Sequence, residues 1–210
     1  MTIRAEQKTA SLQRILAAGA TRLRTQGLSG AGIATVMQDA GLTHGAFYVH
    51  FANKNELAVA ALRHALVDNR KKWVGTLRQE SWADRLKRLA RRYLNLPHRD
   101  NLAQSCALSA LAGEATRSEP SFRQAYEEEL RKSLQGICCG NDAEKAPTPE
   151  QFDEAIAFMA LCLGGLTLSR AVADPNFSER ILQACIKVVG SIAKVPAASD
   201  YPQSDRGASL

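Results

Sequence analysis

Apolar residues recur three and four positions apart along almost the whole chain, and this spacing restricts the fold more than any other feature. The period matches the 3.6 residues per turn of an α-helix and places the apolar side chains on one face. Runs of alternating β-branched residues are absent from the sequence, and so are Asn-Gly or Asp-Gly pairs between such runs. The sequence therefore predicts an all-α fold of about nine helices.

Capping signals place the starts of several helices. Asn53 is followed by Glu56 at capping-box distance, and Thr148-Pro149-Glu150-Gln151 combines an N-cap, a first-turn proline and a Gln at the third helical position. Ser81 and Ser178 are further N-cap candidates. We expect helices over residues 4–26, 31–40, 43–49, 53–77, 81–97, 103–116, 118–137, 148–173 and 179–193.

Basic residues are concentrated in the first half of the chain. Up to Arg99 there are 17 Lys and Arg against 6 Asp and Glu, and after it there are 10 against 15. This asymmetry favours a polyanionic partner, such as nucleic acid, for the first half. A solvated basic surface without a partner is the alternative.

The segment from Gly27 to Lys54 carries the functional signal, and it reads GLSGAGIATVMQDAGLTHGAFYVHFANK. Two short predicted helices, 31–40 and 43–49, flank a tight turn at Gly41-Leu42, and Thr43 is a candidate N-cap for the second. This arrangement is typical of a helix-turn-helix, in which the second helix enters the major groove of DNA.

This segment resembles the N-terminal head of the TetR family of bacterial regulators. The resemblance covers residues 15–62 and rests on matches at fixed offsets: Ala40-Gly41-Leu42-Thr43, Gly45, Phe47-Tyr48-Val49-His50-Phe51, Lys54, Glu56 and Leu57. It implies a three-helix DNA-binding domain over residues 1–52 and a helical effector-binding and dimerisation domain over residues 53–194. Residues 195–210 have no periodic pattern and are expected to form a disordered tail.

The resemblance also implies which residues contact DNA: Thr43, His44, Gly45, Ala46, Tyr48, Val49, His50 and Lys54. The first four take positions where the family touches bases or nearby phosphates, and Tyr48, His50 and Lys54 take positions where it touches the backbone. Val49 stands where a larger polar or aromatic residue is common. Two structural alternatives remain: His50 as a packed histidine bonded to a neighbouring helix, and Tyr48 as a core aromatic. Phe47 and Phe51 are expected in the core.

The last two predicted helices carry the expectation of a homodimer, which the resemblance implies. Residues 155–168 are apolar on nearly all faces, so this helix must be buried on more than one side. A second apolar stripe runs through residues 181–192. Gly164-Gly165 allows either a close approach of two subunits or a tight fit within one subunit.

The resemblance places an unknown small-molecule effector inside the body. The candidate pocket residues are large or apolar side chains, most with a polar tip or sulfur: Trp82, Tyr93, Cys106, Phe122, Tyr126, Phe158 and Met159. Each of them also fits an ordinary core position. Cys106 is either a redox-sensing thiol or a buried structural cysteine. Trp73 lies on the predicted helix that joins the head to the body.

Patterns for catalysis, metal binding and export are missing from the sequence. There is no Ser-His-Asp order, no glycine-rich phosphate loop, and no CxxC pair among the five cysteines. We therefore expect no enzyme activity, no metal and no cofactor. The longest apolar run, residues 155–169, is shorter than the roughly 20 residues of a membrane span, so a soluble cytoplasmic protein with free thiols is expected.

These observations together predict a transcriptional regulator. The expected function is that of a repressor that an effector releases from a double-stranded DNA operator. A helical dimer that binds protein instead of DNA is the alternative.

Overall fold

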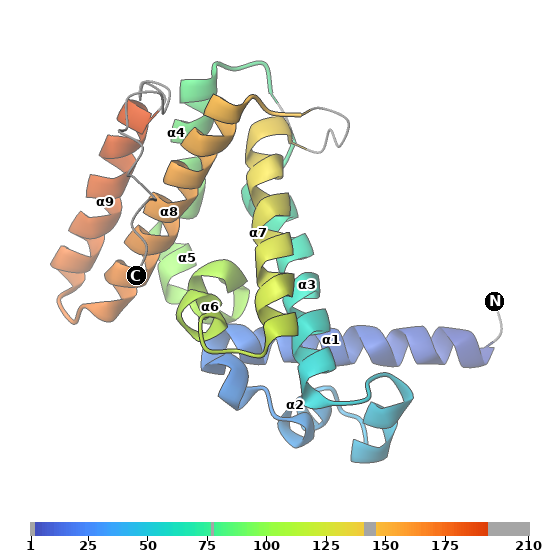
Figure 1. The fold of residues 1–210 in the computed structure, drawn as a ribbon. Coiled ribbons are helices and arrows are strands. Elements are labelled where there is room, and N and C mark those ends of the chain that lie inside the picture. The colour runs from blue at the N-terminus through green and yellow to red at the C-terminus, as the bar shows by residue number, and fades with distance from the viewer. Residues whose placement is uncertain (1–2, 77, 141–145, 193–210) are drawn as a thin grey trace, which may run out of the picture.

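The computed structural model of the protein describes residues 3–76, 78–140 and 146–192. Within these ranges the regular structure is entirely helical, which confirms the predicted all-α fold. The elements are α1 (Ile3–Gly30), α2 (Ile33–Asp39), η1 (His44–Val49), α3 (Lys54–Trp73), α4 (Trp82–Tyr93), α5 (Leu96–Asp100), η2 (Leu102–Gln104), α6 (Ala107–Ala115), α7 (Pro120–Cys139), α8 (Pro149–Ala171) and α9 (Pro175–Ile192); η1 and η2 are 3₁₀ helices (Figure 1).

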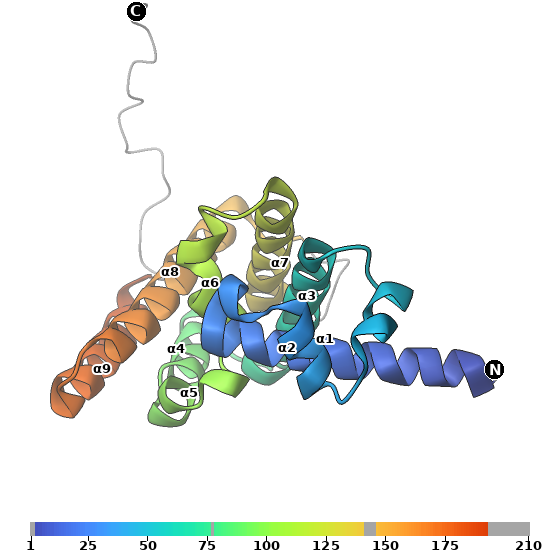
Figure 2. The same ribbon diagram turned by 90° about the horizontal axis from the view of Figure 1, so that it is seen from below.

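The helices form a head and a body that share α3. Figures 1 and 2 show α1, α2 and η1 gathered around the N-terminal end of α3. Towards its other end α3 packs along α7, while α4, α8 and α9 lie together on the far side of the molecule. The 20 residues of α3 span about 30 Å at 1.5 Å per residue, so one helix connects the recognition end to the body.

Local capping explains three of the helix starts, as the sequence predicts. Asn53 Oδ1 accepts a hydrogen bond from the Glu56 N–H (2.9 Å), and Glu56 Oε2 accepts one from the Ala52 N–H (2.8 Å). Ser81 and Thr148 likewise accept from N–H groups of the first turns of α4 and α8. These bonds satisfy donors that a helix start leaves unpaired.

The predicted start of the last helix is wrong. It begins at Pro175 instead of after Ser178, because proline suits the first turn of a helix and Asp174 Oδ1 accepts from the Asn176 N–H (2.9 Å). Ser178 is buried, and its hydroxyl donates to the Ser169 carbonyl of α8.

The predicted helices 81–97 and 103–116 also have different bounds. The chain leaves α4 after Tyr93, and Asn95 caps the separate helix α5, with Pro97 in its first turn. Asn101 then caps η2, so α6 begins only at Ala107. The extra turns arise because two asparagines provide caps within seven residues, and both compete with a continuous helix.

The helix that begins at Lys54 ends at Trp73, before the predicted end at Leu77. Gly75 has φ +66°, a left-handed conformation that terminates helices and suits glycine. Leu77, residues 141–145 between the predicted helices 118–137 and 148–173, and the predicted tail 195–210 lie outside the described residues.

In the described part of the chain, α8 is the one helix long and apolar enough to cross a membrane by length and composition. Its contacts with α4, α5, α6, α7 and α9 are those of a helix in the body of a folded domain.

Gly27 interrupts α1 near its end with φ +69°, directly after the end of the predicted helix 4–26. The Glu114 carboxylate of α6 occupies the space that a side chain at this position would need, and its Oε2 accepts a hydrogen bond from the Leu28 N–H (2.6 Å). This junction therefore joins the head to the body and requires glycine for both its conformation and its space.

Replacing Gly27 with alanine should lower the free energy of unfolding by about 2 kcal/mol, because a left-handed alanine costs roughly 1–2 kcal/mol and the Glu114 side chain must also move. Urea denaturation followed by circular dichroism measures the effect. The control is Gly113→Ala in α6, where a Cβ meets nothing within 4 Å. The control should be neutral or stabilising by up to about 1 kcal/mol. Equal stability of Gly27→Ala and the unsubstituted protein would contradict this account of the junction.

Candidate nucleic-acid interface and body cavity

The turn between α2 and η1 has the geometry of a helix-turn-helix. Gly41 has φ +62°, its N–H donates to the Gln38 carbonyl, and the Leu42 N–H donates to the Met37 carbonyl (both 2.9 Å). Thr43 occupies the N-cap position of η1 with extended backbone. Its side chain makes no capping hydrogen bond, so the prediction of a Thr43 cap is correct for position and wrong for the bond.

Residues 43–50, here called the recognition segment, divide into buried and exposed sides. Phe47 is fully buried and Phe51 is 7% exposed, which confirms both as core residues. Tyr48 is 63% exposed, which excludes the core alternative for this side chain. Four more predicted contact residues of this segment are exposed: Thr43, His44, Gly45 and Val49. Ala46 and His50 are half-buried.

The first helix supports the recognition segment from behind. Ser11 Oγ lies 2.8 Å from His50 Nε2, and Arg14 Nη2 donates to the Gly41 carbonyl (3.0 Å). Burial, and then the nearby Lys8 charge, lower the pKa of His50, so the ring stays neutral at neutral pH. The bond to Ser11 agrees with the structural alternative for His50, and a phosphate contact from His50 stays a prediction.

Sequence reasoning missed Ser11, Arg14 and Arg22 as supporting residues. Arg22 donates to both carboxylate oxygens of Asp39 at the end of α2 (2.6 and 2.9 Å). All three side chains belong to α1 and contact α2, the turn or the recognition segment. Nothing local in the sequence pairs them with residues 17 to 39 positions away.

Lys54 begins α3 directly after the Asn53 cap and is exposed. The first turn of a helix presents free N–H groups and the positive end of the helix dipole. An exposed lysine there adds a full positive charge next to these groups. This end of α3 is suited to an anion such as a phosphate.

The sequence comparison identifies the head. The family model described as "Bacterial regulatory proteins, tetR family" matches residues 15–61, which include α2, the turn, η1 and the start of α3. A curated relative, the HTH-type transcriptional regulator BetI of Burkholderia thailandensis, is 28% identical over 157 residues, covering 73% of this chain and 78% of the relative.

The head of the chain is therefore similar to the DNA-binding heads of the TetR family.

Solved structures of TetR-family regulators share the fold over most of the chain. A regulator from Chloroflexus aurantiacus has a TM-score of 0.70 at 19% identity, covering 90% of this chain and 96% of its own. The reduced form of Escherichia coli NemR has a TM-score of 0.68 at 20% identity, covering 87% and 96%. These structures show that the chain shares their fold over most of its length, in the body as well as in the head.

The body encloses a small apolar cavity between α3, α4, α6, α7 and α8. Its volume is about 40 Å³, enough for a few water-sized molecules. Four predicted pocket residues line it: Tyr93, Cys106, Phe158 and Met159. Trp73, which sequence reasoning treated only as a connector residue, lines it as well.

The other three predicted pocket residues lie elsewhere in the described structure. Trp82 Nε1 donates to Glu154, Tyr126 Oη donates to the Leu108 carbonyl (2.8 Å), and Phe122 is buried in the core. In this arrangement they form parts of helix packing instead of the cavity wall.

Two polar atoms at the cavity lack a normal hydrogen-bond partner within the described residues, Trp73 Nε1 and Tyr93 Oη. The Cys106 thiol beside Tyr93 is a weak hydrogen-bonding group. Burial raises the pKa of Tyr93 well above its usual value, so the phenol remains a donor. Buried donors without partners are costly, and a ligand that accepts hydrogen bonds would satisfy them.

A buried polar network surrounds His98 next to the cavity. The ring stacks on Trp73 with centroids 4.0 Å apart, Nδ1 donates to the Tyr93 carbonyl (2.7 Å), and Nε2 accepts from the Cys106 N–H (3.1 Å). Arg170 of α8 donates to the His98 carbonyl (2.6 Å). One donor and one acceptor on the ring are the pattern of a neutral histidine. Burial, with the Arg170 charge as a smaller contribution, lowers its pKa from 6.5 to about 4.

The His98 network predicts acid sensitivity. The pKa of His98 is lower in the folded state than in the unfolded state, so protons bind the unfolded state more tightly. The free energy of unfolding is therefore highest above pH 6.5 and falls as the pH decreases towards 4. The loss should approach about 3 kcal/mol, since each pKa unit corresponds to 1.36 kcal/mol. Urea denaturation between pH 7 and 4 should give a smaller decrease for His98→Gln than for the unsubstituted protein. The control His44→Gln, at an exposed residue, should give the same decrease as the unsubstituted protein.

Direct titration of the His98 ring by NMR keeps this test independent of the variant's folding. A ring that titrates near its ordinary value would contradict a neutral buried His98.

The described residues contain no group of three or more His, Cys, Asp or Glu side chains that could hold a metal ion. The five cysteines are free, and three of them are buried: Cys106, Cys139 and Cys162. Burial raises the pKa of Cys162 strongly, which keeps that thiol protonated.

Proposed function

We propose that the protein is a repressor that binds an operator as a two-fold dimer and leaves it when a small molecule occupies the body. The observation that carries this proposal is the recognition segment, whose outer face is exposed while Phe47 and the α1 side chains Ser11 and Arg14 hold it from behind. A fixed, exposed segment of this kind is what a major-groove contact needs.

The proposed DNA contacts are those that the family resemblance implies. Thr43, His44, Gly45 and Ala46 would lie at the base edges or the adjacent phosphates, with Val49 beside them, and Tyr48, His50 and Lys54 would lie at the backbone. Gly45 supports this arrangement, because no atom lies within 4 Å of a Cβ built there, so the DNA can approach its backbone closely.

The proposed dimer interface is the outer face of α8 and α9. Large apolar side chains of these two helices are exposed: Leu168, Phe177 and Val188, together with Ile156, which lies beside α7. Gly164 also faces open space, whereas a Cβ on Gly165 would meet Cys185 of α9. Gly165 thus fits tightly within the subunit, and Gly164 leaves room for a partner helix. Burial of such a face is the usual reason for a homodimer.

We propose the domain boundaries that the sequence suggests, residues 1–52 for the head and 53–194 for the body, in a soluble cytoplasmic protein. Because α3 belongs to both units, a ligand that favours another position of α3 also favours another spacing of the two heads. The ligand shifts this equilibrium only by its difference in affinity for the two arrangements.

The double substitution Tyr48→Ala with Lys54→Ala tests the proposed function. It should weaken operator binding at least tenfold and reduce the slope of log affinity against log salt concentration by about 2 per dimer, since each lost lysine–phosphate contact contributes roughly 0.9. Fluorescence anisotropy on the upstream intergenic DNA of its own gene, at two salt concentrations and with excess competitor, measures both.

The matched control is Lys71→Ala, which removes a lysine from the opposite end of the same helix and should leave DNA binding unchanged. Sequence-independent binding that is equal in all three proteins would contradict the proposal and would favour a module that binds protein.

Leu168→Glu should convert the dimer into a monomer, because it places a charge on the proposed interface at a side chain that is 58% exposed in the single subunit. Analytical ultracentrifugation measures the mass. Leu102→Glu, at an exposed apolar residue away from α8 and α9, should remain dimeric. Retention of the dimer by Leu168→Glu would exclude this face as the interface.

A further inference from the structure

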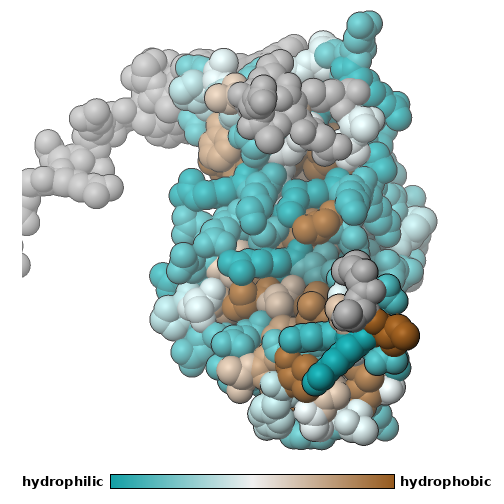
Figure 3. Space-filling view, turned by 90° about the vertical axis from the view of Figure 1, so that its right-hand side faces the viewer, coloured by the Kyte–Doolittle hydropathy of each residue, from teal (hydrophilic) through white to brown (hydrophobic). Residues whose placement is uncertain are grey.

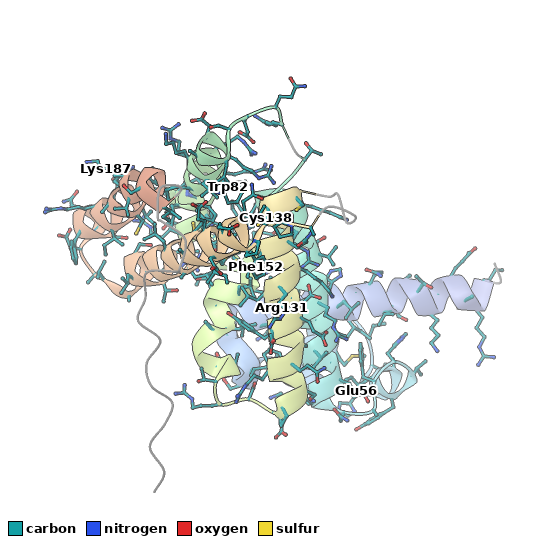
Figure 4. All side chains as sticks on the ribbon, turned by 45° about the horizontal axis from the view of Figure 1, so that its top comes forward. Glu56, Trp82, Arg131, Cys138, Phe152 and Lys187 are labelled. Carbon is teal, nitrogen blue, oxygen red and sulfur yellow. The ribbon has the colours of Figure 1, made fainter. Side chains whose placement is uncertain are left out.

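A positively charged groove lies between α3 and α7, over the start of α8. Its volume is about 590 Å³, and its apolar floor includes Val67, Val74 and Phe152. Its rim carries four cations, Arg70, Lys71, Arg131 and Lys132. Figure 4 labels Arg131 on α7 and Phe152 at the neighbouring start of α8, and Figure 3 shows the side of the molecule where hydrophilic side chains surround small apolar patches.

Among the described residues, the cations of the rim outnumber the carboxylates that pair with them. Glu129, which is almost fully buried, pairs with both Arg70 and Lys132, each at 2.6 Å. Arg131 pairs with Glu127 (2.8 Å), and Lys71 has no ion pair among the described residues. Two carboxylates thus face four cations, and the excess positive charge favours an anion in this groove.

The groove and the apolar cavity share a wall. Arg70 and Val74 line both of them. Val74 is the C-cap of α3 and precedes Gly75, so its side chain sits where the helix ends. A ligand that displaces this side chain would connect the groove to the cavity.

Two of the residues that line the cavity, Trp73 and Tyr93, carry buried hydrogen-bond donors. Trp73 Nε1 and Tyr93 Oη have no normal partner there among the described residues. Arg70 and Trp73 are three residues apart and therefore lie on one face of α3. A single acceptor group at this point could bind both side chains, while Phe158, Met159 and Leu108 offer an apolar surface beyond it.

We propose that the effector is an amphipathic carboxylate, whose apolar chain enters the cavity past Val74 and whose carboxylate binds Arg70 at the junction with the groove; this rests on the proposed effector function of the body. The carboxylate supplies the acceptor that the donors lack and the negative charge that the rim favours. A cationic ligand of the same shape would meet Arg70, Lys71 and Lys132, and a neutral one would gain nothing from them.

The ligand would displace α3 in two ways, by expanding the cavity and by competing for Arg70. The cavity of about 40 Å³ is smaller than an alkyl chain requires, so binding must move the C-terminal end of α3 relative to α7. Competition of the ligand carboxylate with Glu129 for Arg70 would loosen the same contact. The other end of α3 begins at Lys54, shortly after the recognition segment.

Octanoate, octan-1-ol and octylamine test the proposal, because they share one alkyl chain and differ only in the head group. Trp73 fluorescence in a Trp82→Phe background reports binding. Octanoate should bind at least tenfold more tightly than the other two probes. Arg70→Gln should remove this preference, and Arg63→Gln, which removes an exposed arginine of the same helix, should preserve it.

The double variant Arg70→Gln with Glu129→Gln covers the case in which the single variant unfolds, since it leaves no unpaired buried carboxylate. Equal binding of the three probes, preferred binding of octylamine, or a preference for octanoate that survives the loss of Arg70 would overturn the proposal.

DNA binding is measured separately, so that the two proposals fail in different ways. Operator binding without any octanoate preference overturns the ligand class alone. Octanoate binding that leaves operator affinity unchanged supports the site and contradicts effector release.

Discussion

The packing of α3 decides how the head is oriented, because this helix begins beside the recognition segment and finishes at the body cavity. Its first half contacts α1, where a Cβ on Gly19 would lie 3.0 Å from the Ala61 Cβ, so the two backbones are in close contact. Its second half packs along α7 through the Arg70–Glu129 pair. A rigid helix with close contacts at both ends transmits a displacement instead of absorbing it.

The junction between head and body adds polar contacts to this packing. The Glu114 carboxylate of α6 binds the backbone after Gly27, and Asn55 donates to Ser121 at the start of α7 (2.6 Å). These bonds are directional, so they hold for one relative orientation of the two units. A change in the arrangement of the body therefore changes the orientation of the head, as coupling between two distant sites requires.

Local sequence signals predicted the elements that depend on neighbouring residues. The Asn53 cap, the inward phenylalanines and the all-α class follow from spacing alone. The errors arose where several local signals compete: Ser178 resembles an N-cap, although Pro175 begins the helix three residues earlier. The Ser11–His50 and Arg70–Glu129 contacts join residues 39 and 59 positions apart. Their formation depends on the tertiary packing, which one sequence without a fold does not specify.

For the cavity, the sequence predicted the types of residue in its wall, whereas the helix packing determines which of these residues meet. The residue types predicted a pocket with aromatic walls, and four of the seven candidates meet at one cavity. The selection among them depends on which helices pack together, and Trp73 joins them because α3 passes between α4 and α7. The uneven charge of the groove depends on the sharing of Glu129 by two cations, which only the fold brings about.

The distance between the two recognition segments in the proposed dimer, without DNA, tests most directly whether the body holds the heads through α3. An encoded spin-label amino acid at Gly45, which faces open space, leaves the native cysteines in place, and double electron–electron resonance gives the distance distribution. We predict a narrow distribution centred near one DNA turn, about 34 Å. A broad distribution would mean that the body does not fix the heads, and the absence of a dipolar signal would mean that the chain does not dimerise.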